Sequence, residues 1–445
     1  MASRSKAGTA LAALREDLAG DVFAPGDPGY DAARTVFNGM TDRHPAVIAQ
    51  CADEGDVVRA VRFARDLDLH IAVRGGGHGL VGAAPAEGAL LVDLRRMHEV
   101  TVDPAAEAAR VGGGATMSDL DRATRPHGLA VSGPTASAVG VGGFVLGGGT
   151  GQLDRAFGLT VDSLIGVELV TADAERVHAN PDENPELFWA LHGGGGNFGI
   201  ATALTLELHE LPEFSVTLLL HPPESGRQVV RAFRRIIGTG PDRLSGAVTC
   251  PVGDGPMYGA LLTYTGTAAD LRELAGPLLA LPHEAELEGA GALRLLDRPA
   301  GPRAHWSAEC LTGLPDELVD LFCARAEALP VPGGSRCTLF PLGGAVATGP
   351  ARYPVAYRNA PWVAHPFAGW ADPADDERAL AEVRDTVAAM RPWSTGAVCL
   401  SLVGDEGPER VAAGLGAGNL LRLEKVKRAY DPDNVFRCNH NIRPV

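Results

Sequence analysis

The chain has 445 residues, of which 45% are hydrophobic and 21% are charged, as is usual for a globular protein of two or three domains. Its formal net charge of −16 argues against a nucleic-acid groove or an anionic membrane as a partner. Seven scattered cysteines without a CxxC pair predict neither a disulfide framework nor a metal site, and no run of about 18 apolar residues predicts a membrane span. We therefore expect a cytoplasmic enzyme or binding protein.

The first part of the chain, to about residue 210, alternates short strands, helices and glycine-rich loops. Residues 45–68 predict a strand followed by a helix, and residues 89–94 predict a further strand. A capped helix is expected over 116–128, where apolar residues recur at helical spacing. Val/Leu alternation around a TADAE turn predicts a hairpin over 164–179.

Residues 211–400 have a different character. They contain fewer glycine runs, more proline and long amphipathic helices such as ESGRQVVRAFRRIIG. Strands such as SGAVTC and YGALLTYTG lie between these helices, so a separate α+β unit is expected. The tail, residues 424–445, is again loop-like and contains a DPDN turn.

Glycine is concentrated in three segments, 75–79, 140–151 and 193–199. A single glycine-rich loop is more often a turn than a binding site, but three in one region indicate a ligand. Glycines let successive N–H groups face one anion and leave room for a phosphate or a ring beside the main chain. A Rossmann site is not expected, because GVGGFVLGGG lacks the GxGxxG spacing and no clear helix follows it; no GK[ST] marks a P-loop either.

Four motifs together resemble one known family. They are PAVIAQCADEGDVVRAVRFARDLDLHIAVRGGGHGLVG, GVGGFVLGGGTG, DENPELFWALHGGGGNFGIAT and YDPDNVFRCNHNI. In order and spacing, over about residues 30–445, they resemble the berberine bridge enzyme-like FAD-linked oxidases of the vanillyl-alcohol oxidase superfamily.

The resemblance implies an α+β fold in three parts. A PCMH-type FAD-binding domain of two α/β subdomains would begin with residues 1–210. A substrate domain, an antiparallel sheet covered by helices, would occupy residues 211–410. Residues 411–445 would return to the FAD-binding domain.

The resemblance also implies which residues hold the FAD. The histidine of the GGGH motif, His78, would bond covalently to the flavin 8α carbon. The first glycine segment would wrap the pyrophosphate, the second would approach the ring and ribityl chain, and the third would contact the adenine side. Besides His78, the implied cofactor-binding residues are Arg74, Gly75, Gly76, Gly77, Gly79, Thr135, Val139, Gly140, Gly142, Gly143, Gly147, Gly148, Gly149, Gly196, Asn197, Gly199, Ile200, Asn439 and Asn441.

The sequence departs from the family pattern at the flavin. The cysteine that bonds the flavin C6 in bicovalent members corresponds to Ala136, and no cysteine lies between 52 and 249. A single attachment through His78, as in a monocovalent bacterial member, is therefore expected. The usual arginine before GGGGNFG is His192, and a further tyrosine is replaced by Leu420.

The catalytic residues depart further. The Tyr-x-Asn pair that the family usually carries on the substrate sheet is replaced by Cys399 and Ser401, and the NQN motif becomes NHN, which places His440 near the cofactor. Cys399, Ser401 and His440 are therefore the catalytic candidates, although a buried cysteine is more often a small hydrophobe than a thiolate. Other polar candidates of the middle domain are Tyr264, His305, Tyr353, Tyr357 and Trp370.

The function implied is that of an FAD-dependent oxidase. It would take a hydride from a small organic molecule, a secondary-metabolite alcohol, amine or activated ring carbon, to flavin N5 and pass the electrons to O₂ as H₂O₂. Two alternatives stay open, and the loss of the tyrosine motif motivates the first of them. One is a flavoprotein that sequesters a metabolite with little turnover, and the other is a dehydrogenase with an acceptor other than O₂.

Overall fold

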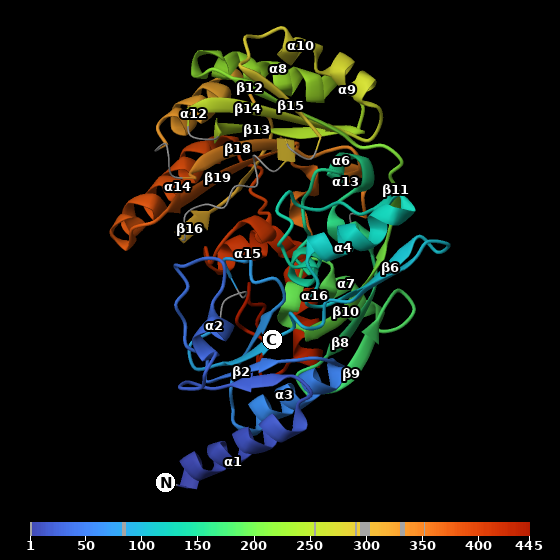
Figure 1. Ribbon diagram of the computed structural model, residues 1–445, viewed down its shortest axis with the longest axis vertical. Helices are drawn as coiled ribbons and strands as arrows, with labels where there is room; N and C mark the ends of the chain where they lie inside the picture. The colour runs from blue at the N-terminus through green and yellow to red at the C-terminus, as the bar shows by residue number, and fades with distance from the viewer. Residues whose placement is uncertain are drawn as a thin grey trace.

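The structure, a computed structural model, describes residues 2–81, 86–252, 255–289, 292–293, 303–329, 334–350 and 352–445. Figure 1 shows a large sheet with helices over its outer face at one end of the molecule and two smaller sheets toward the other end. The C-terminal residues lie back among the strands of the smaller sheets.

The N-terminal sheet contains, in spatial order, β1 (Asp21–Phe23), β2 (Val47–Gln50), β4 (Leu90–Asp93) and β3 (Ile71–Arg74). The last three strands run parallel, and β1 is antiparallel to β2. Helix α3 (Glu54–Asp66) begins after Asp53, whose side chain accepts a hydrogen bond from the Asp56 amide. Its apolar residues at helical spacing join the core of this sheet, and α1 (Ala2–Asp17) and α2 (Tyr30–Arg34) complete the unit.

The second sheet is antiparallel and contains, in spatial order, β5 (Val100–Asp103), β6 (Ala108–Gly112), β10 (Ile200–Glu207), β8 (Leu164–Val170) and β9 (Arg176–Ala179). Strands β8 and β9 pair as the predicted hairpin. The predicted helix over 116–128 forms as α4 (Met117–Thr124), since Thr116 and Asp119 make a capping box at its start. The other elements of this unit are β7 (Leu129–Ala130), β11 (His209–Glu210), α5 (Val141–Leu146), α6 (Asp154–Phe157) and α7 (Pro185–Leu191).

The large sheet is antiparallel and contains, in spatial order, β15 (Ala285–Glu288), β12 (Ser215–His221), β14 (Met257–Tyr264), β13 (Leu244–Val252), β18 (Arg336–Pro341), β19 (Trp362–Trp370) and β16 (Arg303–Trp306), with β17 (Glu309–Leu311) also on β19. Helices cover its outer face (Figure 1). In α8 (Gly226–Thr239), the residues Val229, Phe233 and Ile237 recur at helical spacing and are buried against the strands. The helices of this part are α8 (Gly226–Thr239), α9 (Ala268–Leu274), α10 (Gly276–Leu279), α12 (Asp316–Glu327), α13 (Ala345–Thr348) and α14 (Asp376–Met390).

The chain returns to the first two sheets through α15 (Pro408–Leu415) and α16 (Ala417–Tyr430). The return is anchored by a fully buried ion pair, in which Lys427 Nζ lies 2.6 Å from a carboxylate oxygen of Asp431. Lys427 also donates to the carbonyl oxygens of Asn197, at 2.8 Å, and Phe436, at 2.9 Å. The Asp431 carboxylate in turn accepts from the amides of Val435 and Phe436. These bonds fix the last residues against the third glycine segment.

The second glycine segment and the domain boundaries can be compared with the predictions from the sequence. The sequence shows no clear helix after GVGGFVLGGG; the structure forms α5 within this segment, because Val141, Val145 and Leu146 can all be buried on one short helix, and only the four-residue α6 directly follows it. Strand β11 ends at Glu210 and β12 begins at Ser215; the boundaries 1–210, 211–410 and 411–445 stay predictions.

Within the described ranges, no helix is long and apolar enough to cross a bilayer.

Replacing Lys427 by methionine should strongly destabilise the protein. The substitution leaves the Asp431 carboxylate buried without its cation, which costs about 3–5 kcal/mol in comparable cases. The free energy of unfolding in urea measures the loss, and Lys425→Met is the matched control, because Lys425 lies on the same helix and is exposed. Equal stability of the two variants would contradict a structural role for the ion pair.

Candidate functional site

A cavity of about 710 Å³ lies where the three glycine segments meet one face of the large sheet. Its lining includes residues of all three segments, together with residues of β13, β18 and β19 and of the chain around 400–403 and 436–440. A cavity of this size is within the range that holds a small molecule or a cofactor. It is therefore the candidate functional site.

The first two glycine segments touch backbone to backbone. A Cβ atom added to Gly76 would lie 2.3 Å from the Gly140 nitrogen, and one added to Gly140 would lie 2.2 Å from the Gly76 nitrogen. A Cβ at Gly142 or Gly75 would come within 3.0 Å of the Gly113 carbonyl oxygen at the end of β6. These glycines are required for the two loops to approach each other.

Other glycines of the cavity have open space beside them. At Gly143, Gly195 and Gly196 an added Cβ would meet no atom within 4 Å, and all three residues line the cavity. A side chain at these positions would project into space that a ligand could fill. Among the residues that the structure describes, no lysine lines the cavity and its arginine, Arg336, lies on β18 of the large sheet, so the glycine segments offer a phosphate backbone N–H groups and no basic side chain other than histidine.

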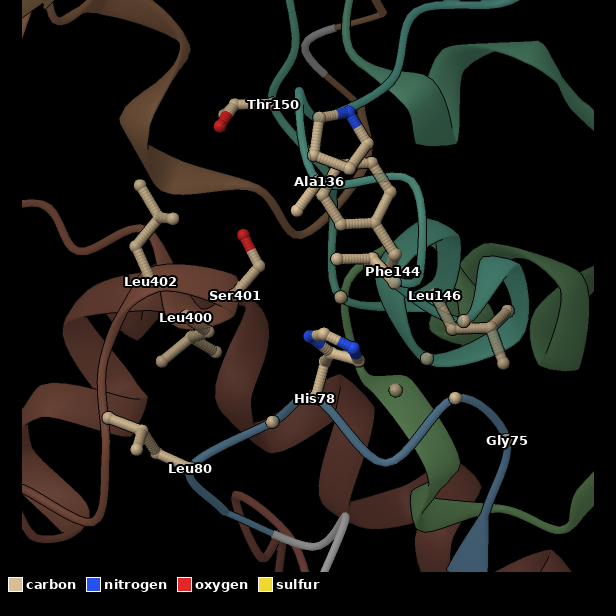
Figure 2. A pocket seen from close by; sticks show the side chains of 18 of the residues that line it. Gly75, His78, Leu80, Ala136, Phe144, Leu146, Thr150, Leu400, Ser401 and Leu402 are labelled. Atoms are coloured by element: carbon tan, nitrogen blue, oxygen red, sulfur yellow. The ribbon is translucent and has the colours of Figure 1, made fainter. Parts of the chain in front are cut away.

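His78 projects into this cavity. Figure 2 shows its imidazole pointing between the segment that carries Ser401, the loop that carries Ala136 and the helix that carries Phe144. The ring stacks on Phe37, with centroids 4.6 Å apart and planes 7° from parallel. Burial lowers the pKa of His78, so the imidazole is neutral and nucleophilic near neutral pH.

Arg74 does not line the cavity. Its side chain is fully buried, and its guanidinium forms an ion pair with Asp93 at 2.6 Å and donates to the carbonyl oxygens of Ala33 and Thr35. Burial opposes ionisation of Asp93, but hydrogen bonds from Arg95 and Arg74 lower its pKa. The Arg74 side chain therefore holds the strand end that leads into Gly75, and the contact of Arg74 with the pyrophosphate stays a prediction.

Most of the other predicted residues meet at the cavity. Gly148 and Gly149 do not line it: they adopt positive φ of 107° and 68°, and a Cβ on them would strike the Tyr357 hydroxyl and Thr160. Asn441 and Cys399 lie outside its lining as well. The predicted residues that do line it are Gly75, Gly76, Gly77, His78, Gly79, Thr135, Val139, Gly140, Gly142, Gly143, Gly147, Gly196, Asn197, Gly199, Ile200, Ser401, Asn439 and His440.

Cys399 has the environment of a buried thiol. Its Sγ lies 3.3 Å from the Ser401 hydroxyl oxygen, and its side chain is completely enclosed. Burial raises the pKa of Cys399 to about 11, so a thiolate is disfavoured at neutral pH. Ser401, which lines the cavity, is the member of this pair that a ligand can reach.

His440 and its neighbours close one end of the cavity. His440 Nε2 lies 3.0 Å from the Leu400 carbonyl oxygen, which fixes Nε2 as the donor. The Asn197 side chain donates to the carbonyl oxygens of Gly194 and His440 and accepts from the Ile442 amide. Asn197 thus joins the third glycine segment to the C-terminal residues. This structural role comes in addition to the contact with the adenine side that the family resemblance implies.

The structure also brings in residues that sequence reasoning missed. Phe37, Trp306, Arg336, His365 and Phe367 all line the cavity, whereas Tyr264, His305, Tyr353, Tyr357 and Trp370 do not. Alternate residues of a strand share one face, so the sequence of β18 and β19 could have shown that Arg336, His365 and Phe367 belong to alternating sets of residues. The sequence alone did not tell which face of those strands meets the glycine segments.

His192, which stands in place of the family's usual arginine, is buried in the core. Its Nδ1 lies 2.7 Å from the Phe188 carbonyl oxygen, and its ring stacks on Tyr353 with centroids 3.7 Å apart. Burial lowers its pKa to about 4, so the ring is neutral. Because His192 does not line the cavity, it supports the helix before the third glycine segment and does not contact a ligand.

Comparison with known proteins agrees with this site. Residues 45–180 match a family model described as an FAD binding domain, and residues 408–443 match one described as berberine and berberine like. The (R)-6-hydroxynicotine oxidase of Paenarthrobacter nicotinovorans is 31% identical over 461 aligned residues, which cover 96% of this chain and 97% of that protein.

Solved structures agree as well. The 6-hydroxy-D-nicotine oxidase from Arthrobacter nicotinovorans is similar with a TM-score of 0.85 and 27% identity, covering 96% of this chain and 98% of that one. The glucooligosaccharide oxidase from Acremonium strictum has a TM-score of 0.85 and 25% identity, with 99% of each chain covered. The α+β fold and its glycine-lined cavity are those of an FAD-linked oxidoreductase. Within this class, the chain belongs to the berberine bridge enzyme-like family, and its cofactor is FAD.

The residues present fit FAD. The backbone-to-backbone contact of the first two glycine segments leaves N–H groups, not side chains, at the cavity wall, and the open space beside Gly143, Gly195 and Gly196 accommodates a large ligand. A neutral imidazole, His78, stands in the same cavity. The cavity therefore offers both a surface for phosphates and a nucleophile for the flavin.

Gly140→Ala should lower FAD content and stability together. The new Cβ would overlap the Gly76 nitrogen, so the loops must separate at a cost on the order of 1–3 kcal/mol. FAD absorbance per protein and urea unfolding measure both effects. Gly238→Ala is the control, because a Cβ there meets nothing within 4 Å on helix α8. Full FAD content and stability in Gly140→Ala would contradict the close contact.

Asp154 lies buried beside the second glycine segment. Its carboxyl accepts hydrogen bonds from the Ser132 hydroxyl and the Gly151 amide. Burial nevertheless raises its pKa to about 8, from an ordinary value of 3.8. The protonated carboxyl is therefore the form that the folded protein holds at neutral pH.

Asp154→Asn should flatten the dependence of stability on pH. Because the folded pKa lies above the unfolded value, the contribution of Asp154 is complete below about pH 4 and is lost as pH rises toward 8. The wild type should lose stability between pH 5 and 8, and the variant should lose less. Urea midpoints at each pH test this, with the exposed Asp173→Asn as control. Parallel curves for wild type and Asp154→Asn would rule out the raised pKa.

Proposed function

We propose that the protein is an FAD-dependent oxidase that oxidises a small organic molecule and reduces O₂ to H₂O₂. The observation that carries the proposal is the position of His78, whose neutral imidazole enters the cavity that all three glycine segments line. The face of the large sheet on the same cavity provides the surface for a substrate. When bound, FAD supplies a hydride acceptor at N5 and returns the electrons to O₂.

We propose that a ring nitrogen of His78 bonds to the flavin 8α carbon. The new N–C bond replaces one N–H and one C–H bond, so two protons and two electrons must leave, and O₂ can take both to form H₂O₂. Stacking on Phe37 holds the imidazole in one orientation for this reaction. A tethered flavin cannot dissociate between turnovers.

A single tether is proposed. The glucooligosaccharide oxidase described above carries a 6-S-cysteinyl, 8α-N1-histidyl FAD. Here Ala136 lines the cavity where the family resemblance aligns the cysteine (Figure 2), and a methyl group cannot form that link. Of the described cysteines, none lines the cavity other than Cys438, which follows the C-terminal turn.

The walls of the cavity support a substrate that is small, largely apolar and ring-shaped. Trp306 and Phe367 stack with centroids 5.5 Å apart, and Phe37 lies 6.0 Å from Trp306 by the same measure. This row of aromatic rings continues from His78 onto the large sheet. Flat apolar walls of this kind pack against rings and exclude water from the reacting carbon.

His78→Ala should convert a tethered flavin into one that is released. After acid precipitation, wild-type protein should stay yellow, and the variant should leave its flavin in the supernatant, because no covalent bond remains. Absorbance of pellet and supernatant measures this, and His98→Ala, an exposed histidine, is the control. Flavin in the supernatant of the wild type would refute covalent attachment.

Turnover distinguishes the oxidase from its alternatives. Candidate alcohols and amines are mixed with the protein without oxygen, and loss of the flavin absorbance records reduction; O₂ uptake is then measured with the same compounds. Reduction together with O₂ uptake is the expected result. Reduction without O₂ uptake would favour another electron acceptor, and binding without reduction would favour sequestration.

A further inference from the structure

One face of the large sheet meets the cavity in a regular pattern. On β18 the cavity residues are Arg336, Thr338 and Phe340, which alternate along the strand. On β19 they are His365 and Phe367, and the register pairs Thr338 with His365 and Arg336 with Phe367. Residues that pair directly across two strands point to the same face of a sheet, so His365 lies on the cavity face by position as well as by contact.

The tautomer of His365 is determined by its backbone partner. Its Nδ1 lies 2.9 Å from the carbonyl oxygen of Ser307. A carbonyl oxygen only accepts hydrogen bonds, so Nδ1 carries the proton of the neutral ring and Nε2 keeps a lone pair. Nε2 has no hydrogen-bond partner among the described residues and is not one of the enclosed nitrogen atoms of the molecule.

The other histidines of the cavity, and two histidines of the core, differ from His365 in this respect. His440 uses Nε2 to bind the Leu400 carbonyl oxygen. His192 and His221 also bind carbonyl oxygens through Nδ1, but their Nε2 atoms are enclosed in the core and do not reach the cavity. His78 is the proposed flavin tether. Among the described residues that line the cavity, His365 is therefore the histidine, apart from the proposed tether, whose Nε2 lone pair can accept a proton from a substrate.

The charge of the cavity points to the kind of substrate. Among the described residues of its lining there is no aspartate or glutamate to pair with an ammonium group, and Arg336 contributes positive charge from β18. The guanidinium of Arg336 lies 4.3 Å from the centre of the Phe367 ring. A cationic amine would thus meet no carboxylate among the described residues of the lining, which favours an uncharged substrate.

We propose that His365 is the catalytic base, and that its Nε2 takes the hydroxyl proton of an uncharged alcohol carried on an aromatic ring. This assignment rests on the proposed oxidase function. As the alcohol is oxidised, its O–H bond breaks and the proton moves to Nε2, its C–H bond breaks and the hydride leaves to the bound FAD, and a C=O bond forms. His365 then returns its proton to water.

A weak base is sufficient for this step. Burial lowers the pKa of His365 to about 4; the hydrogen bond to the Ser307 carbonyl opposes this decrease, and the positive charge of Arg336 adds a smaller decrease. The ring is therefore unprotonated before each turnover. Because loss of the hydride makes the hydroxyl strongly acidic, proton transfer to a neutral imidazole is favourable at that moment.

The first test does not depend on turnover. Diethyl pyrocarbonate acylates neutral imidazole nitrogens that it can reach, and peptide mass spectrometry of the FAD-loaded protein locates the adducts. We expect modification of His365 and none of His221, which has the same Nδ1–carbonyl bond but an enclosed Nε2. Modification of His221 with His365 unmodified would overturn the assignment.

The second test measures flavin reduction without oxygen by a set of neutral aromatic alcohols headed by benzyl alcohol, and by benzylamine for comparison. His365→Gln should retain its flavin and lose about 100-fold or more in the reduction rate with the best alcohol, while His221→Gln should keep the wild-type rate. Added imidazole should restore part of the rate to His365→Ala. These variants keep His78 and the glycine segments intact.

The outcomes separate the two proposals. A wild-type rate in His365→Gln would overturn the role of His365 and leave the oxidase function standing. Faster reduction by benzylamine than by any alcohol would overturn the choice of an uncharged alcohol. If no compound reduces the wild-type flavin, the proposed function fails, and the assignment of His365 fails with it.

Discussion

The flavin site depends on a place where two backbone segments meet with no side chain between them. Gly76 and Gly140 come so close that a single added carbon on either would overlap the nitrogen of the other. This contact brings the strand end that carries His78 against the loop that carries Ala136, and both then face one cavity. A wall made of main chain also presents N–H groups, which explains how a protein with a net charge of −16 can hold the two phosphates of FAD.

The rest of the cavity is held in place by charges that never reach it. Arg74 and Asp93 support the first loop from below, and Lys427 and Asp431 attach the C-terminal residues to the third loop. Backbone hydrogen bonds support both buried pairs, although Nε of Arg74 is buried without a partner. The ionic groups are used for structure, and the cavity itself is left almost free of charge.

The two sides of the cavity offer different chemical groups to a ligand. One side of the cavity is formed by the glycine segments and His78. The other side is formed by the large sheet, where His365, Arg336 and a row of aromatic rings stand on one face. A neutral, water-poor cavity strengthens each hydrogen bond made within it, so one well-placed imidazole can have a large effect on rate.

The sequence by itself determined the class of protein, the cofactor and the local elements. The three glycine segments and the GGGH motif are local in the chain, as are the capping box of α4 and the β8–β9 hairpin, and local patterns can be recognised without a fold. Only the tertiary structure decided which side chains line the cavity. In the structure the Arg74 and Cys399 side chains lie outside the cavity lining, whereas His365 lines the cavity. His365 faces the cavity because the pairing of β18 with β19 determines which face of these strands turns inward. That choice depends on register between distant segments, which no single stretch of sequence contains.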